Sequence, residues 1–132
     1  MSEENVEVVE RALAALNERD IDGYLACCTE DIQLRTPVSP VAGMYEGADG
    51  IRRFFADIED AGPDFRLDLE RMEAVGGERV LAFVRVTSHG RASGLPTPAE
   101  TGNVYEFEEG KIRRIQIFLD RGEALEAAGL SE

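Results

Sequence analysis

The spacing of the hydrophobic residues changes partway along this chain, and the change limits the folds open to it. Up to about residue 61, most apolar residues recur every three or four positions, which is typical of helices with one buried face. Beyond that point they form short stretches rich in β-branched and aromatic residues, which is typical of strands. Helices followed by a run of strands predict an α+β fold, in which helices pack on one face of a mainly antiparallel sheet.

Three helices are predicted in the first half. Their buried faces are stripes at helical spacing: Val6, Val9, Leu13 and Leu16; then Ile21, Tyr24, Leu25 and Cys28; then Ile51, Phe54, Phe55 and Ile58. Asp20 has the residue type and position of an N-cap for the second helix, and Gly47 or Asp49 opens the third. Gly62 and Pro63 end the third helix, because proline cannot continue it.

Five strands are predicted, over residues 32–36, 65–72, 80–87, 103–107 and 112–119. Asp120 and Glu123 have the spacing of a capping box and predict a short last helix that ends at Gly129. We expect a single domain over residues 1–132, a cone-shaped α+β barrel whose strongly curved sheet wraps around the three N-terminal-half helices. The hollow of such a sheet is a natural site for a small molecule.

The charge excludes two classes of partner. Lys and Arg number 14 and Asp and Glu number 27, so the net charge is −13. Nucleic acids and anionic membranes need clustered cations, and we expect neither as a partner. The acidic N-terminal sequence lacks the pattern of a secretory signal, which predicts a cytoplasmic protein. The adjacent Cys27 and Cys28 are interpreted as reduced thiols, and with one histidine we expect no metal and no cofactor.

Three segments carry a family resemblance: RDIDGYLACCTEDIQLRTP (19–37), YEGADGIRRFF (45–55) and EFEEGKIRRIQIFLDRGEALEAAGL (106–130). With them the chain resembles the SnoaL-like branch of the nuclear transport factor 2-like superfamily, near the polyketide cyclases and ketosteroid isomerases. The resemblance extends from about Val6 to Leu130 and implies the cone-shaped fold. It implies no single activity, because that superfamily includes isomerases, cyclases, epoxide hydrolases, dehydratases and transport adaptors.

Two mechanisms implied by the resemblance lose their reacting groups here. Where ketosteroid isomerases have a tyrosine, an aspartate base and a protonated aspartate, this chain has Ala12, Thr36 and Asn103. Only Asn103 could still act, by donating a hydrogen bond to an oxyanion. The epoxide hydrolases' Arg-x-Asp resembles Arg85-Val86-Thr87, in which the threonine replaces the acid. We therefore expect neither steroid isomerisation nor epoxide hydrolysis by those mechanisms.

The polyketide cyclases' late carboxylate and strand histidine resemble Asp120 and His89, and this is the nearest chemical match. Our catalytic candidates are therefore His89, Asp120 and Arg85. Each has a structural alternative. Asp120 fits an N-cap, and strand alternation turns it away from the core. His89 fits a strand end or a dimer surface. Arg85 could pair with Glu106 or Glu108 on a neighbouring strand, or lie on an exposed face of the sheet.

Six residues are predicted to contact a ligand: Thr36, Met44, Tyr45, Phe55, Asn103 and Tyr105. Asn103 and Tyr105 share one face of a strand, where cross-strand hydrogen bonding is an equal alternative. Met44 and Tyr45 belong to a loop over residues 37–47, which could close a cavity mouth, as could a second loop over 90–102. The alternative for both side chains is apolar packing.

Three functions remain open from the sequence. The first is a cofactor-free isomerase- or cyclase-like enzyme that uses acid/base chemistry on an apolar cyclic or polyketide-like substrate. The second is a non-catalytic module that binds a small apolar molecule, and the third is a dimerising domain with a filled core. All three are compatible with a homodimer, which we expect.

Overall fold

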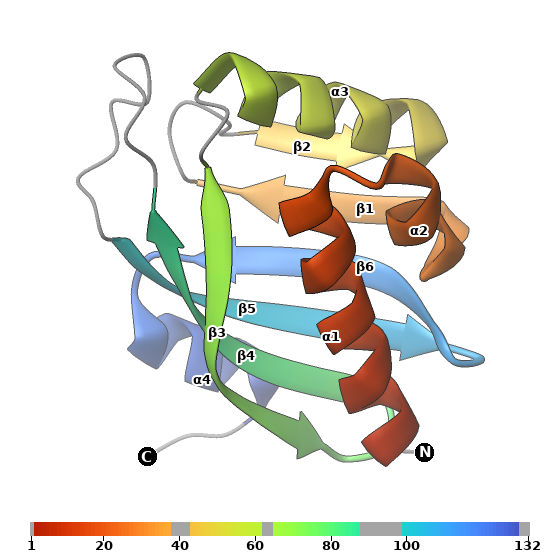
Figure 1. Ribbon diagram of the computed structural model, residues 1–132. Coiled ribbons are helices and arrows are strands. Elements are labelled where there is room, and N and C mark those ends of the chain that lie inside the picture. Colours follow the sequence, from red (N-terminus) through yellow and green to blue (C-terminus); the bar gives the residue numbers. More distant parts are fainter. Residues whose placement is uncertain (1, 38–42, 62–64, 88–98, 130–132) are drawn as a thin grey trace.

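The curved sheet is the centre of the computed structural model, which describes residues 2–37, 43–61, 65–87 and 99–129 (Figure 1). The helices described are α1 (Ser2–Glu18), α2 (Ile21–Ala26), α3 (Gly47–Ala61) and α4 (Arg121–Ala128). The strands described are β1 (Cys28–Thr36), β2 (Gly43–Glu46), β3 (Arg66–Val75), β4 (Arg79–Thr87), β5 (Ala99–Glu108) and β6 (Lys111–Phe118). The predicted α+β fold with a curved sheet wrapped around three N-terminal-half helices is confirmed.

The strand order across the sheet is β2-β1-β6-β5-β4-β3. All neighbouring strands are antiparallel except β1 and β6, which run parallel. Every predicted strand is present, but the prediction of a loop over residues 37–47 was wrong for 43–46. That segment is β2, which pairs with the end of β1 from Gln33↔Glu46 to Thr36↔Gly43. Four residues with a glycine and a methionine carry too little alternation to be recognised as a strand.

The concave face of the sheet holds the main core together with α1, α2 and α3. Strand alternation assigns the side chains to faces, since successive residues point to opposite sides. In β4, Val80, Ala82, Val84 and Val86 face the concave core. Leu81 and Phe83 face the convex side, where they pack in a second, smaller cluster.

Helix α4 covers part of the convex face, on the other side of the sheet from α1 (Figure 1). Helices on one face only were predicted, and α4 corrects this. Ala124 packs so close to β5 that a Cβ on Gly102 would lie 2.4 Å from its Cβ. The helix ends as predicted, with an Asp120 N-cap and with Gly129 in the left-handed region at φ 91°.

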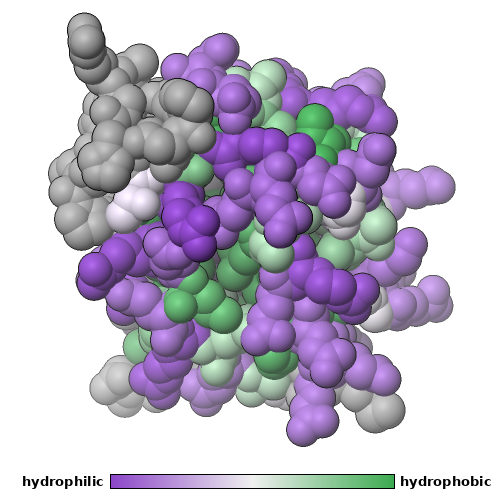
Figure 2. Space-filling view, viewed as in Figure 1, coloured by the Kyte–Doolittle hydropathy of each residue, from purple (hydrophilic) through white to green (hydrophobic). Residues whose placement is uncertain are grey.

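The edge strand β3 is held by the end of α1. Asn17 donates Nδ2 to the carbonyl of Leu67 at 2.7 Å and accepts the Leu67 N–H at 2.9 Å. Such a clamp satisfies backbone groups that an edge strand leaves unpaired. Figure 2 shows this side as mostly hydrophilic, with hydrophobic side chains reaching the surface between α1 and β3. None of the helices described is both long and apolar enough to cross a membrane.

Candidate functional site

A small cavity lies on the concave side of the sheet, between β1, β3, β4, β5, β6 and α3. Its polar wall is made by Thr36, Thr101 and Asn103, all of them buried. Its apolar wall is made by Phe54, Phe65, Leu67, Val86 and Ile117. The volume is about 20 Å³, which is room for about one water molecule. We call this space the inner cavity.

A hydrogen-bonded row of side chains runs along β5 at the inner cavity. Thr101, Asn103 and Tyr105 alternate along the strand, so all three face the concave side. Thr101 donates its Oγ1–H to Oδ1 of Asn103 at 2.9 Å, and Asn103 donates from Nδ2 to Oη of Tyr105 at 3.3 Å. The two bonds hold the amide from both sides and fix which way it points.

The inner end of this row stays uncharged near neutral pH. Burial raises the pKa of Tyr105 to about 12, although the hydrogen bond from Asn103 acts in the opposite direction. Tyr24, packed edge-to-face on Phe55, is also buried, and burial raises its pKa well above the ordinary value. The row therefore offers neutral hydrogen-bonding groups and no proton-transfer acid or base in the usual pH range.

An open groove of about 560 Å³ shares two lining residues with the inner cavity. It is lined by Arg35, Thr36, Pro37, Gly43, Met44, Ile117, Phe118, Leu119 and Glu123. Thr36 and Ile117 line both spaces, so they stand at the junction. Small-molecule sites commonly span about 300–1,000 Å³, a range that the groove meets and the inner cavity does not.

The structure brings together part of the predicted ligand-contact set. Thr36 and Asn103 line the inner cavity, Tyr105 is bonded to Asn103, and Met44 lines the groove. Tyr45 and Phe55 line neither space. Tyr45 packs against α3 and donates its hydroxyl to Asp57 at 2.7 Å, and burial is the main cause that raises its pKa to about 12.

Arg85 and Asp120, two of the three catalytic candidates, have structural partners. Arg85 is on the convex face, where it pairs with Glu70 at 3.2 Å and Glu100 at 3.6 Å, and not with the predicted Glu106 or Glu108. Asp120 caps α4 by accepting the N–H groups of Gly122 and Glu123. His89 lies outside the described residues, as does most of the predicted loop over 90–102. Neither Arg85 nor Asp120 lines the inner cavity or the groove.

Several lining residues were not predicted from the sequence. Strand alternation could have identified Thr101, because it lies two residues before Asn103 on the same strand and so faces the same side. Phe54 lines the cavity in place of its neighbour Phe55, a choice that helical spacing alone could not make. Glu123 was recognised only as part of a capping box, yet it lines the groove.

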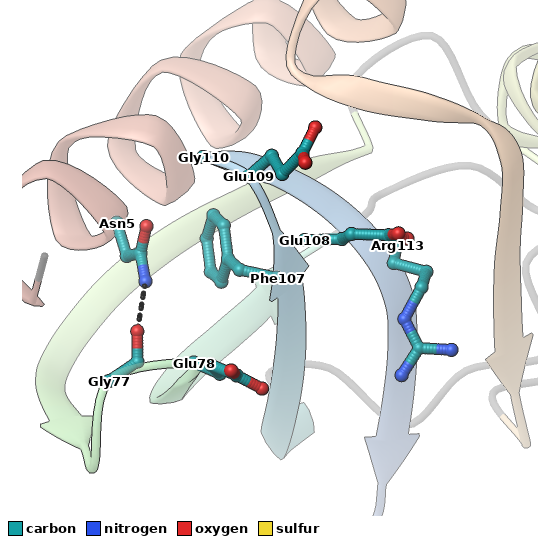
Figure 3. Close-up of a pocket in the computed structure, with 8 residues that line it drawn as sticks. All are labelled: Asn5, Gly77, Glu78, Phe107, Glu108, Glu109, Gly110 and Arg113. Carbon is teal, nitrogen blue, oxygen red and sulfur yellow. Dashed lines mark hydrogen bonds between the residues drawn. The ribbon is translucent and has the colours of Figure 1, made fainter.

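A separate cavity of about 510 Å³ lies near the N-terminal end of α1. It is lined by Asn5, Gly77, Glu78, Phe107, Glu108, Glu109, Gly110 and Arg113. Figure 3 shows Asn5 reaching the carbonyl of Gly77, a bond of 3.1 Å, with the Phe107 ring beside it. Buried Asn5 thus ties α1 to the turn between β3 and β4. We interpret this cavity as structural, since its polar groups come mainly from two hairpin turns.

The possible metal ligands of this chain are its acidic residues, its two cysteines and its single histidine. Within the part of the chain that the structure describes, no three His, Cys, Asp or Glu side chains are grouped so that they could hold a metal ion. Cys27 and Cys28 are buried free thiols, and burial raises the pKa of Cys28 to about 12. A thiol of that kind is unreactive at neutral pH.

The curved sheet around three helices, with a cavity on its concave side, defines a nuclear transport factor 2-like protein. Solved structures of nuclear transport factor 2-like proteins share this arrangement. Within this fold class, the chain belongs to the SnoaL-like domain family, whose sequence model matches residues 9–115. No curated protein matches the chain.

Three solved structures illustrate the likeness. Bal32a, from a soil-derived mobile gene cassette, is 24% identical, covers 88% of each chain and has a TM-score of 0.78. TerC, co-crystallized with polyporic acid, is 23% identical over 96% of this chain and 98% of its own, with a TM-score of 0.73. A candidate polyketide cyclase from Sinorhizobium meliloti is 19% identical over 84% and 93%, with a TM-score of 0.70. At these identities the likeness shows the fold.

Proposed function

We propose that this chain binds a small, largely apolar molecule that carries a carbonyl or hydroxyl oxygen. The body of the ligand lies in the groove, and its oxygen reaches the inner cavity. One observation carries the proposal: a hydrogen-bonded polar row is buried in an otherwise apolar cone, with donor groups that no described residue uses.

The unused capacity follows from the bonds of the row. An asparagine amide has two N–H donors, and a tyrosine hydroxyl can both accept and donate. Asn103 uses one N–H for Tyr105, and the Tyr105 hydroxyl accepts that bond. Among the described residues, none accepts the second Asn103 N–H or the Tyr105 O–H. Buried polar groups are usually satisfied, so a ligand oxygen is a good occupant for the remaining donor of Asn103.

The sizes of the two spaces decide how a ligand would lie. The inner cavity holds one oxygen-sized group, and the groove holds a molecule of one or two rings. Ile117 is partly buried and packs against the main core at the junction. Its side chain must change rotamer for a ligand oxygen to pass from the groove to Asn103, a movement that is common at binding sites.

A matched pair of probes tests the proposal. 1-Indanone and indane differ in one carbonyl group and have nearly the same apolar body. We expect the wild type to bind 1-indanone more tightly than indane, by about fivefold, for one hydrogen bond worth about 1 kcal/mol. Asn103→Leu should remove the preference, measured by ligand-observed NMR titration.

Gln33→Leu is the control, because it removes an amide from the exposed side of β1, where Gln33 bonds Glu46. It should leave the preference for 1-indanone intact. If Asn103→Leu keeps the full preference, the oxygen does not bind at Asn103. If neither probe binds the wild type, the groove is not a ligand site.

Enzymatic chemistry is a second candidate, favoured by one observation. Among the described residues that line the groove, Glu123 is the one with a carboxylate. The Asp120 carboxylate instead caps α4. In that mechanism Glu123 takes a proton next to a carbonyl while the Asn103 N–H stabilises the developing oxyanion. This is cofactor-free isomerase- or cyclase-like chemistry, in keeping with the family.

Deuterium exchange at the carbon next to the carbonyl of 1-indanone, followed by NMR in D₂O, tests the enzymatic candidate. Exchange above the buffer rate that is lost in Glu123→Gln and kept in Asp120→Asn supports it. Exchange at the buffer rate with bound ligand leaves the binding function alone.

We also propose a homodimer, as the family resemblance implies. Light scattering with size-exclusion chromatography should give twice the chain mass at micromolar concentration, and a monomer mass would contradict this.

A further inference from the structure

Arg35 is a cation on the wall of the groove, and no described residue neutralises it. It lies on β1, directly between Met44 of β2 and Gln116 of β6 in the strand pairing. Neither neighbour carries a charge. Arg35 makes no ion pair and no side-chain hydrogen bond with any residue that the structure describes.

The other arginines on the described strands all have partners. Carboxylates pair with Arg66, Arg71, Arg85, Arg113 and Arg114. Arg79 donates to the carbonyl of Ala128 at 3.4 Å. In a chain with 27 acidic and 14 basic residues, partners are plentiful, so an arginine without one stands out. Its position beside a mostly apolar groove distinguishes it further.

Glu123 lines the same groove and is the charge that could oppose an anion there. Its position has a reason of its own: it lies in the first turn of α4, where the helix dipole stabilises a negative side chain. It forms no ion pair with Arg35. The two charges come from different elements, β1 and α4, so an anionic group beside Arg35 need not contact Glu123.

The environment of Arg35 suits the anionic end of an apolar molecule. Met44 and Leu119, both exposed large hydrophobic residues, line the groove with Pro37, Ile117 and Phe118. A guanidinium presents a planar fork of N–H donors that can bond two oxygens of one anionic group, such as a carboxylate, a phosphate or a sulfonate. An apolar ring on the hydrophobic wall would place such a group within reach of Arg35.

We propose that the natural ligand is an amphipathic organic anion, whose negatively charged group binds Arg35 while its apolar body fills the groove. This inference rests on the proposed small-molecule function and narrows its substrate class. The oxygen directed at Asn103 and the anionic group at Arg35 are then two separate polar ends of one molecule.

Two fluorescent probes with the same ring system test this. 8-Anilino-1-naphthalenesulfonate carries an anionic group, and N-phenyl-1-naphthylamine is its neutral analogue. We expect Arg35→Gln to weaken binding of the sulfonate by about threefold to fivefold, the usual effect of one exposed charge pair. Binding of the neutral probe should not change. High salt should weaken sulfonate binding in the wild type and have less effect in Arg35→Gln.

Arg66→Gln is the matched control, because Arg66 is an exposed strand arginine far from the groove lining and paired with Asp68. It should leave both affinities unchanged. If Arg35→Gln changes neither affinity, or lowers both equally, the anion preference is wrong while the apolar site stands. If the neutral probe does not bind the wild type, the proposed small-molecule function fails with it.

Discussion

Replacing Asn103 by leucine should lower the free energy of unfolding, because it breaks the hydrogen bonds of the polar row on β5. The substitution removes two buried bonds, Thr101 Oγ1–Asn103 Oδ1 at 2.9 Å and Asn103 Nδ2–Tyr105 Oη at 3.3 Å. It leaves Thr101 and Tyr105 in an apolar cavity without these partners. An unsatisfied buried polar group costs about 1–3 kcal/mol, so the two together should cost about 2–6 kcal/mol.

The triple variant Thr101→Val, Asn103→Leu, Tyr105→Phe separates this mechanism from simple loss of packing. Replacing all members of a hydrogen-bonded set by apolar groups of similar shape is nearly neutral, because nothing is left unsatisfied. The triple variant should therefore be more stable than Asn103→Leu alone. Urea unfolding followed by far-UV circular dichroism measures both. A loss below about 0.5 kcal/mol in Asn103→Leu, or a larger loss in the triple variant, would refute the reasoning.

Three further predictions test other parts of the structure. Gly102→Ala should cost about 1–3 kcal/mol, because the new Cβ would lie 2.4 Å from the Ala124 Cβ; a neutral effect in thermal unfolding would show that α4 is not packed this closely. Asp120→Ala should lower the free energy of unfolding by about 1 kcal/mol, because the N-cap of α4 is lost, whereas Asp120→Asn should keep most of the stability. A change in ligand affinity in Asp120→Asn would contradict a purely structural role. The chain has three tyrosines, and burial raises the pKa of each, so phenolate absorbance should not develop near pH 10 in the folded protein. The stability from the neutral phenols is intact below pH 10, and the part from Tyr45 and Tyr105 is lost as pH rises toward about 12. A titration near pH 10 without unfolding would contradict their burial.

The fold was predictable because the long helices and central strands carry strong periodic patterns. The caps at Asp20 and Asp120 and the stop at Gly129 follow local rules, and all three are present. The strand β2 was missed because its pairing with β1, not its four residues, makes it a strand. The position of α4 on the convex face depends on Gly102 of β5, because a glycine has no Cβ and so leaves room for the Ala124 side chain of α4. No local pattern in the sequence shows that contact.

The candidate site was predictable only in part, since a site depends on which side chains share a space. Parity along β5 gave Asn103 and Tyr105 correctly as one face, and it also puts Thr101 there. Parity in β4 would have put Arg85 opposite the core residues Val84 and Val86, where it now pairs with Glu70.

The other misses depend on three-dimensional packing. Whether Phe54 or Phe55 meets the cavity depends on the rotation of α3. Whether Asp120 or Glu123 meets the groove depends on where α4 begins. Neither rotation nor placement can be read from spacing within one segment.

The side-chain amide of Asn103 tests the central claim most directly. In a ¹⁵N-labelled sample titrated with 1-indanone, the Asn103 Nδ2–H₂ signals, assigned by their absence in Asn103→Leu, should shift more than those of Asn5 and Asn17. Those two amides already bond backbone carbonyls, and neither asparagine lines the inner cavity or the groove. Saturable shifts centred on Asn103, with smaller shifts at Met44 and Ile117, would confirm that the ligand oxygen reaches the inner cavity. Saturable binding that leaves the Asn103 signals unmoved would contradict the account.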